Sequence, residues 1–187
     1  MKNLCITLSL LFLTLACFAA TDVAQTRDHL TEQEVDLVKE AQLLDKRIEV
    51  FVRAAERRVM VLNGTATATT NAKQLKKDSE RWGELPTGSR AELVGDIAHI
   101  FDEAITNIDD VSSRDERNPL IPKALRRLSQ AVNSIVEQLA PIQAQVKTDA
   151  EVASFELLNE DAQSIKEAAN KLPPEVVDKK AKAKNER

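Results

Sequence analysis

The side chains that usually carry out catalysis or bind metal ions are sparse in this chain of 187 residues. Its two histidines are His29 and His99, and neither belongs to a His-x-x-x-His or Glu-x-x-His pattern, which would place metal ligands on one helix face. His99 falls opposite the apolar positions of its predicted helix, so we expect its imidazole to face solvent. Haem ligation by Met60 and His99 is therefore the least favoured alternative. We predict no catalytic residue, no cofactor and no metal site.

Other catalytic motifs are also missing from the sequence. The four glycines are too scattered to form a phosphate-binding loop, and no serine lies in a Gly-x-Ser-x-Gly turn. Acidic pairs such as Asp109-Asp110 are uninformative in a chain with 30 aspartates and glutamates. An enzyme or a cofactor carrier is therefore only the third hypothesis for the function.

The first residues have the features of an export signal. Lys2 precedes an apolar run from Leu4 to Leu15, which is shorter than the roughly 20 residues needed to cross a bilayer. Small residues follow, and cleavage after Ala19 makes residues 1–19 a signal peptide. Cys17 leaves an alternative open, because residues 13–17 are similar to a bacterial lipoprotein cleavage box in which Cys17 becomes a lipid anchor. Plain cleavage is the preferred prediction, because Thr14 stands where that box usually has leucine.

The composition favours an all-α protein without a nucleic-acid partner. Aromatic residues make up 3% of the chain and tyrosine is absent, whereas strands favour aromatic and β-branched residues. The net charge is −4, which argues against non-specific binding to nucleic acid. No cysteine follows Cys17, so we expect no intramolecular disulfide and a fold that depends on packing alone.

Four long amphipathic stretches predict an antiparallel bundle of four main helices, with one short helix packed on its side. Apolar residues recur every three or four positions in each stretch, as they do on one face of a helix. The predicted long helices span residues 30–62, 89–111, 122–146 and 148–172, and the short helix spans Ala72–Trp82. Pro141 predicts a kink or a break near Glu137–Pro141, and the continuous apolar phase favours the kink.

The helix boundaries have their own signals. A capping box pairs a hydroxyl with a glutamate three positions later, so that each side chain accepts a hydrogen bond from the other residue's backbone amide. Three such boxes occur in the sequence, at Thr31/Glu34, Ser89/Glu92 and Thr148/Glu151. Asn63-Gly64 predicts the end of the first long helix, and Pro173-Pro174 predicts the end of the last.

Charged residues of the first long helix are expected to form a solvated face, with a recognition surface as the alternative. These residues are Asp45, Lys46, Arg47, Arg53, Glu56, Arg57 and Arg58. Pairs three or four positions apart on such a face contribute about 0.2–0.5 kcal/mol each. Trp82, the only tryptophan, is expected to pin the short helix to the bundle, and ligand stacking is the alternative role.

The predicted organisation is a signal peptide (1–19), a flexible lead-in (20–30), a helical bundle (31–172) and a disordered basic tail (173–187). The sequence does not determine the molecular function. The preferred hypothesis is an exported, non-enzymatic binding or interaction module of the cell envelope, periplasmic or secreted, whose partner is unknown. Contact with a membrane is expected only through a lipid at Cys17. A structural or self-associating protein, forming a homo-oligomer through its helix stripes, is the second hypothesis.

Overall fold

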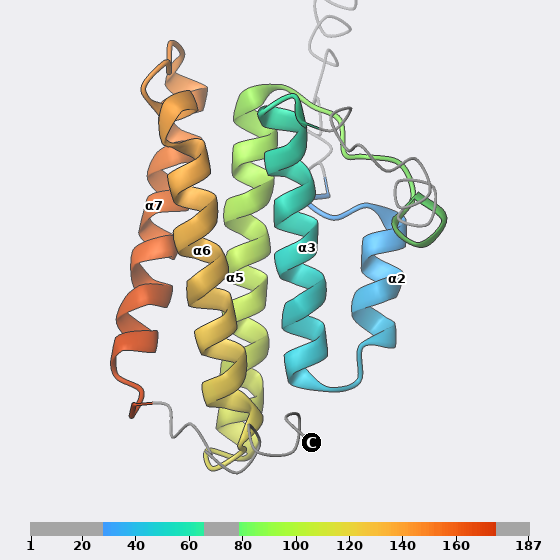
Figure 1. The fold of residues 1–187 in the computed structure, drawn as a ribbon, viewed down its shortest axis with the longest axis vertical. Helices are drawn as coiled ribbons and strands as arrows, with labels where there is room; N and C mark the ends of the chain where they lie inside the picture. The colour runs from blue at the N-terminus through green and yellow to red at the C-terminus, as the bar shows by residue number, and fades with distance from the viewer. Residues whose placement is uncertain (1–27, 66–78, 175–187) are drawn as a thin grey trace, which may run out of the picture.

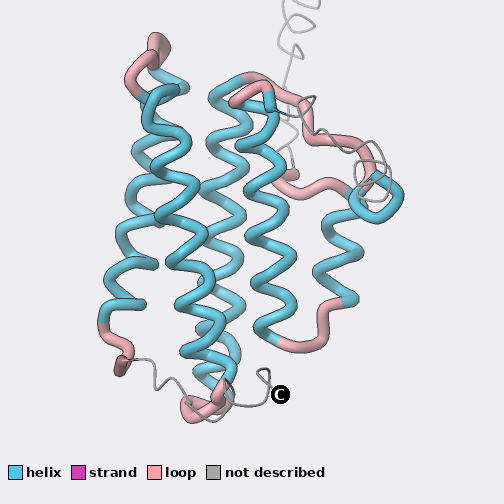
Figure 2. The backbone as a smooth tube through the Cα atoms, in the orientation of Figure 1, coloured by secondary structure: helices cyan, strands magenta, loops and turns pink. Residues whose placement is uncertain are grey.

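The computed structural model describes residues 28–65 and 79–174, and regular secondary structure in this part of the chain is entirely helical (Figure 1). The helices are α2 (Glu32–Glu40), α3 (Leu44–Leu62), α5 (Arg90–Arg114), α6 (Leu120–Gln143) and α7 (Asp149–Asn170). Figure 2 shows short loops joining α2 to α3, α5 to α6 and α6 to α7 at the two ends of the molecule. The predicted all-α bundle of four main helices is confirmed.

Helices α3, α5, α6 and α7 form the bundle, and α2 packs outside it against α3 alone among these helices. Successive main helices run in opposite directions, but α5 and α6 face each other across a diagonal of the bundle. This diagonal step makes α3 and α6 parallel neighbours. The ion pairs Asp45–Lys123 and Glu49–Arg127 show it, because the second pair lies one helix turn further along both helices.

The predicted apolar stripes form the core of the bundle. Phe51 of α3 and Phe101 of α5 have no exposed surface. The other stripe positions that become buried are Leu37, Leu44, Ile48, Ala55, Val59, Val94, Ile97, Ala104, Ile108, Leu125, Leu128, Val132, Ile135, Leu139, Phe155, Leu158, Ala162 and Ile165. Each stripe leaves water only by packing against the others, so the four helices stabilise one another.

All three predicted capping boxes are present. The hydroxyls of Thr31, Ser89 and Thr148 each accept the backbone N–H of the glutamate three positions later, and the glutamate side chain accepts the N–H of the capping residue. Helix α6 begins without such a cap at Leu120, two positions before its predicted start, and Pro122 lies in its first turn.

The predicted single helix over residues 30–62 is wrong, because residues 41–43 separate α2 from α3. The spacing of three or four residues between apolar positions continues across this break. The hydrophobic pattern alone therefore does not reveal it. Arg47 donates from Nε to the carbonyl of Ala41 at 3.2 Å and satisfies an acceptor at the end of α2. As a result α2 folds back beside α3 instead of extending it (Figure 1).

Other boundaries shift by a few residues. Helix α6 continues through Pro141 and ends at Gln143, so it does not break before the proline. Residues 79–82 are helical and are followed by Gly83 with φ 68°, whereas the rest of the predicted helix 72–82 lies outside the described residues. Leu30 is 7% exposed and joins the core, so the packed body includes a residue that the sequence assigned to the lead-in.

The predicted signal peptide (1–19), Cys17 and residues 175–187 of the basic tail lie outside the described residues. The last helix ends at Asn170, two positions before the predicted end, and Pro173-Pro174 follow it.

Candidate functional site

A buried cluster of charges joins α2 to the bundle. Arg58 of α3 is 1% exposed, and its two terminal nitrogens each lie 2.8 Å from an oxygen of Glu34 on α2. Arg57 lies 3.4 Å from the same carboxylate, and Asp96 of α5 lies 3.8 Å from Nε of Arg58. The prediction that Arg57 and Arg58 face solvent is therefore wrong. Opposite charges balance in this cluster, as burial requires.

The same two arginines hold neighbouring chain segments against α3. Arg58 donates to the carbonyl of His29 at 2.5 Å, which fixes the residues that precede α2. Arg57 donates to the carbonyls of residues 82–84, at 2.6 Å for Trp82, and its guanidinium carbon lies 5.7 Å from the centre of the indole ring. Trp82 is thus held against α3, but most of the short helix that it is expected to pin lies outside the described residues. A guanidinium can do this because its donors point in several fixed directions.

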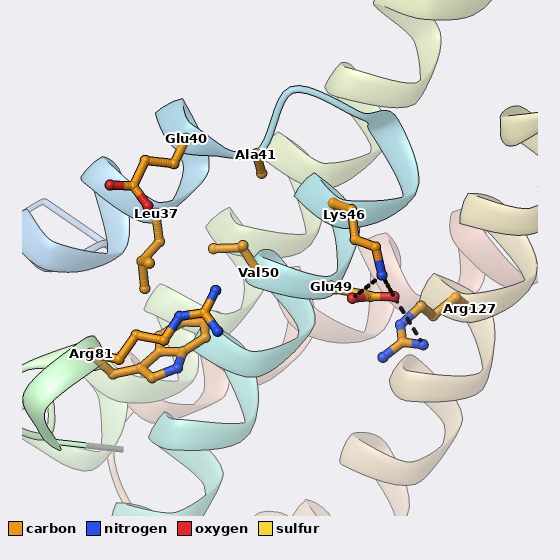
Figure 3. Close-up of a pocket in the computed structure, with 9 residues that line it drawn as sticks. Leu37, Glu40, Ala41, Lys46, Glu49, Val50, Arg81 and Arg127 are labelled. Carbon is orange, nitrogen blue, oxygen red and sulfur yellow. Dashed lines mark hydrogen bonds and ion pairs between the residues drawn. The ribbon is translucent and has the colours of Figure 1, made fainter. Parts of the chain in front are cut away.

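A pocket of about 430 Å³ lies between α2, α3 and the helical turn at residues 79–82 (Figure 3). We call it the α2–α3 pocket. Its apolar lining residues are Leu37, Ala41, Val50 and Trp82, and its charged lining residues are Glu40, Lys46, Glu49, Arg81 and Arg127. The pocket exists because the chain breaks at residues 41–43 and α2 forms a separate wall. Pockets of this volume are typical of small-molecule sites.

The charges around the α2–α3 pocket are unevenly paired. Nζ of Lys46 lies 3.1 and 3.2 Å from the two oxygens of Glu49, and Arg127 of α6 lies 3.6 Å from the same carboxylate. The carboxylate of Glu49 therefore pairs with two cations. Within residues 28–65 and 79–174, Arg81 and Glu40 have neither an ion pair nor a hydrogen bond from their side chains. Figure 3 shows the guanidinium of Arg81 extending toward Val50.

His29 makes a second attachment between the segment before α2 and the bundle. Its Nε2 lies 2.8 Å from a carboxylate oxygen of Glu103 on α5, and its ring centre lies 5.8 Å from that of His99. The hydrogen bond to Glu103 raises the pKa of His29 above its ordinary value, although burial acts in the opposite direction. His99 is exposed, as predicted.

Three further carboxylates have shifted pKa values, and none of them lines the α2–α3 pocket. Hydrogen bonds from the backbone of Lys147 and Thr148 lower the pKa of Glu151 at the start of α7. Burial raises the pKa of Asp161 on α7 to about 6, and the charge of Asp102 adds to the effect. Asp45 is buried, contrary to prediction, and the hydrogen bond that it accepts from Lys123 lowers its pKa. Asp45 pairs with Lys123, whereas one carboxylate oxygen of Asp161 is buried without a hydrogen-bond partner among the described residues, and the two groups do not converge on a common site.

A second cavity, of about 550 Å³, lies beside the turn that follows residue 79, and Glu84 is its only charged lining residue. No cluster of three or more metal-binding side chains occurs in residues 28–65 and 79–174. In the same ranges, no helix combines the length and the apolar character that crossing a membrane requires.

Sequence reasoning identified only part of this site. Trp82, with ligand stacking as an alternative role, and Lys46, with recognition as an alternative, both line the pocket, whereas Arg81 and Arg127 were missed because exposed helical arginines are common. One signal for Arg58 was available. It lies three residues after Ala55 and four before Leu62, which places it in phase with the core stripe.

Comparisons with protein-family models, curated proteins and solved structures found no match to this chain. Its function therefore has to follow from its own residues and their geometry.

Proposed function

We propose that this protein is an exported, non-enzymatic binding module of the cell envelope that holds a small organic ligand in the α2–α3 pocket. The observation that carries the proposal is the lining of the pocket, where Leu37, Val50 and Trp82 lie beside charged side chains. Ligand sites commonly combine these features, because apolar walls contribute affinity and a few polar groups fix the orientation of the ligand.

The types of lining residue support binding rather than catalysis. The nine lining residues include no histidine, serine, threonine or cysteine, which are frequent catalytic bases and nucleophiles. The carboxylate of Glu49 is already engaged by Lys46 and Arg127. The scaffold also suits binding, since one wall, α2, contacts only α3 among the described helices and can adjust to a ligand.

Export is supported by Lys2, the apolar run over residues 4–15 and the small residues that follow. Sequencing the N-terminus of the mature protein should give a start between Cys17 and about Gln25. Labelling with a radioactive fatty acid decides whether Cys17 is lipidated, and we expect no label. A cytoplasmic protein that retains Met1 would contradict export.

The pocket can be tested with the intrinsic fluorescence of the protein. Trp82 is the only tryptophan and tyrosine is absent. Fluorescence excited at the long-wavelength edge of the protein absorption band therefore comes from Trp82, which lines the pocket. We expect 4-phenylbutan-1-ol, a neutral apolar probe, to change this emission saturably. Ala41→Phe should fill the pocket and abolish the change.

Ala144→Phe is the matched control, because Ala144, like Ala41, is the C-cap residue that directly follows a helix, but it does not line the pocket. Wild-type protein that shows no saturable change, or that binds no better than Ala41→Phe, would refute the proposed site.

A further inference from the structure

We propose that the ligand of the α2–α3 pocket is a small organic anion, with an apolar or aromatic body and a single carboxylate or similar group. This inference rests on the proposed function, because it names the chemical class of ligand for the same pocket. It follows from the charges of the lining and from where the apolar residues lie among them.

The pocket has a surplus of positive charge. Lys46, Arg81 and Arg127 contribute three cations, and Glu40 and Glu49 contribute two carboxylates, which leaves one positive charge in a chain whose net charge is −4. The lining therefore has the opposite sign to the protein as a whole. A monoanion would neutralise it, and its approach would be favoured by the local potential.

Arg81 is the residue best placed to contact the anionic group. The buried arginines of α3 are occupied, since Arg58 binds Glu34 and Arg57 binds the carbonyls of residues 82–84. Arg81 has no such partner in residues 28–65 and 79–174, and Figure 3 shows its guanidinium reaching toward Val50. A guanidinium pairs with a carboxylate through two parallel hydrogen bonds, which also fixes the orientation of the ligand.

The Lys46–Glu49–Arg127 group provides a second source of positive charge. Figure 3 shows it on the far side of Val50 from Arg81. The side chains of Lys46 and Arg127 are 57% and 51% exposed, so either can turn toward an anion while the other keeps Glu49 neutralised. The apolar body of the ligand then lies against Leu37 and Val50, between the two cationic regions.

A cationic ligand fits this lining less well. Glu49 already contacts two cations, so Glu40 is the single carboxylate left to receive an ammonium group. Glu40 also disfavours ligands with two anionic groups, because the second would meet its carboxylate. The lining thus favours a monoanion over a cation or a dianion.

Three probes that share one apolar body separate these classes at pH 7. They are 4-phenylbutyrate, the neutral 4-phenylbutan-1-ol and the cationic 4-phenylbutan-1-amine, each titrated against full-length protein while the emission of Trp82 is recorded. We expect the acid to bind most tightly and the amine least. Arg81→Gln should weaken binding of the acid by about five-fold, the size expected for a partly exposed ion pair, and should leave the alcohol unchanged.

Arg114→Gln is the matched control, because Arg114 ends α5 with a 75% exposed side chain and does not line the pocket. Its affinities should equal those of the wild type. Raising the salt concentration should weaken the acid alone.

The outcomes separate the two proposals. If the alcohol or the amine binds at least as tightly as the acid, the anionic class is refuted while the binding pocket stands. If Arg81→Gln weakens the acid and the alcohol equally, Arg81 acts on the fold and its role as the anion contact is refuted. If none of the three probes binds saturably, the proposed function itself fails.

Discussion

The four-helix bundle and the segment that contains α2 are held together by different forces. In the bundle, apolar stripes meet around Phe51 and Phe101, which are fully buried. In the segment formed by residues 28–40, which we call the α2 arm, Leu30 and Leu37 are buried, but the decisive contacts are ionic, from Glu34 and His29. Apolar packing supplies stability, whereas ionic contacts fix positions and contribute little net free energy.

This difference explains why the candidate site lies at the border of the two regions. A ligand pocket needs one rigid wall to position the ligand, and it benefits from a second wall that can move to accommodate it. Helix α3 supplies the rigid wall, because it packs against α5 and α6, and α2 supplies the other wall with α3 as its only helical neighbour in the described chain. The α2 arm should therefore open locally at a lower free energy than the bundle unfolds.

The largest expected effect is on the bundle. Phe51→Ala should lower the free energy of unfolding by about 3–5 kcal/mol, because it loses transfer free energy and leaves a cavity among packed helices. Denaturant unfolding followed by circular dichroism measures the change. Leu157→Ala, at a residue that is 37% exposed on α7, is the control and should cost little. A loss below about 1 kcal/mol for Phe51→Ala would mean that the stripe is not the source of stability.

The next effect distinguishes the α2 arm from the bundle. Glu34→Gln keeps the size of the side chain and its capping role but leaves Arg58 without its bidentate partner. We expect a loss of about 1–3 kcal/mol, limited because α2 can move away and expose Arg58 to water. Hydrogen exchange should speed up in α2 and remain slow in α5. Glu32→Gln, in the same first turn but exposed, is the control, and equal acceleration in both helices would refute the distinction.

The sequence predicted the bundle well because the apolar residues that form its core repeat at regular intervals along each helix. Val94, Phe101 and Ile108 share one helix face whatever they pack against, and a capping box such as Ser89/Glu92 is a local pattern. The α2 arm was not predicted, because its break preserves the apolar phase. Its ionic contacts join residues 24 positions apart, as in Arg58–Glu34, and no local pattern encodes such a pair.

The candidate site was predicted least. Trp82 was considered for a ligand, but the pocket depends on where α2 returns along α3 and on Arg127, which comes from α6. Those relations arise from tertiary packing. A charged residue in a solvated helix and one at the rim of a pocket look alike in sequence, so Arg81 carried no signal.

Helix caps provide a smaller comparison of the two regions. Ser89→Ala removes a cap from the bundle and Thr31→Ala removes one from the α2 arm, and each hydrogen bond is worth about 1 kcal/mol. We expect Ser89→Ala to lower the global thermal midpoint, and Thr31→Ala to act mainly on exchange rates within α2. If both variants lower the global midpoint equally, the α2 arm and the bundle unfold as one unit.

A charge on α7 should produce a smaller effect of opposite sign. The pKa of Asp161 is about 6 in the folded protein against an ordinary value of 3.8, so its ionised form costs stability that is recovered as pH falls through this range. Asp161→Asn should therefore raise the unfolding free energy at pH 7, by about 0.2–1 kcal/mol because the group is partly solvated. Glu156→Gln, exposed on the same helix, is the control. No gain at pH 7, or a gain that persists at pH 4, would contradict the burial of this charge.

The smallest expected effect concerns His29 in the α2 arm. Its contact with Glu103 raises its pKa, and the nearby charges of Asp28 and Asp96 act in the same direction. A raised folded pKa means that the contact stabilises the protein fully below the unfolded value of about 6.5 and is lost as pH rises through the folded value. His29→Gln should therefore speed exchange in α2 at pH 5.5 and match the wild type at pH 8.5, after correction for intrinsic exchange rates. Glu103→Gln should reproduce this pattern, and the double variant should add nothing, because both remove one contact. If His29→Gln changes the bundle amides as much as those of α2, the histidine belongs to the bundle and the division between the two regions must be redrawn.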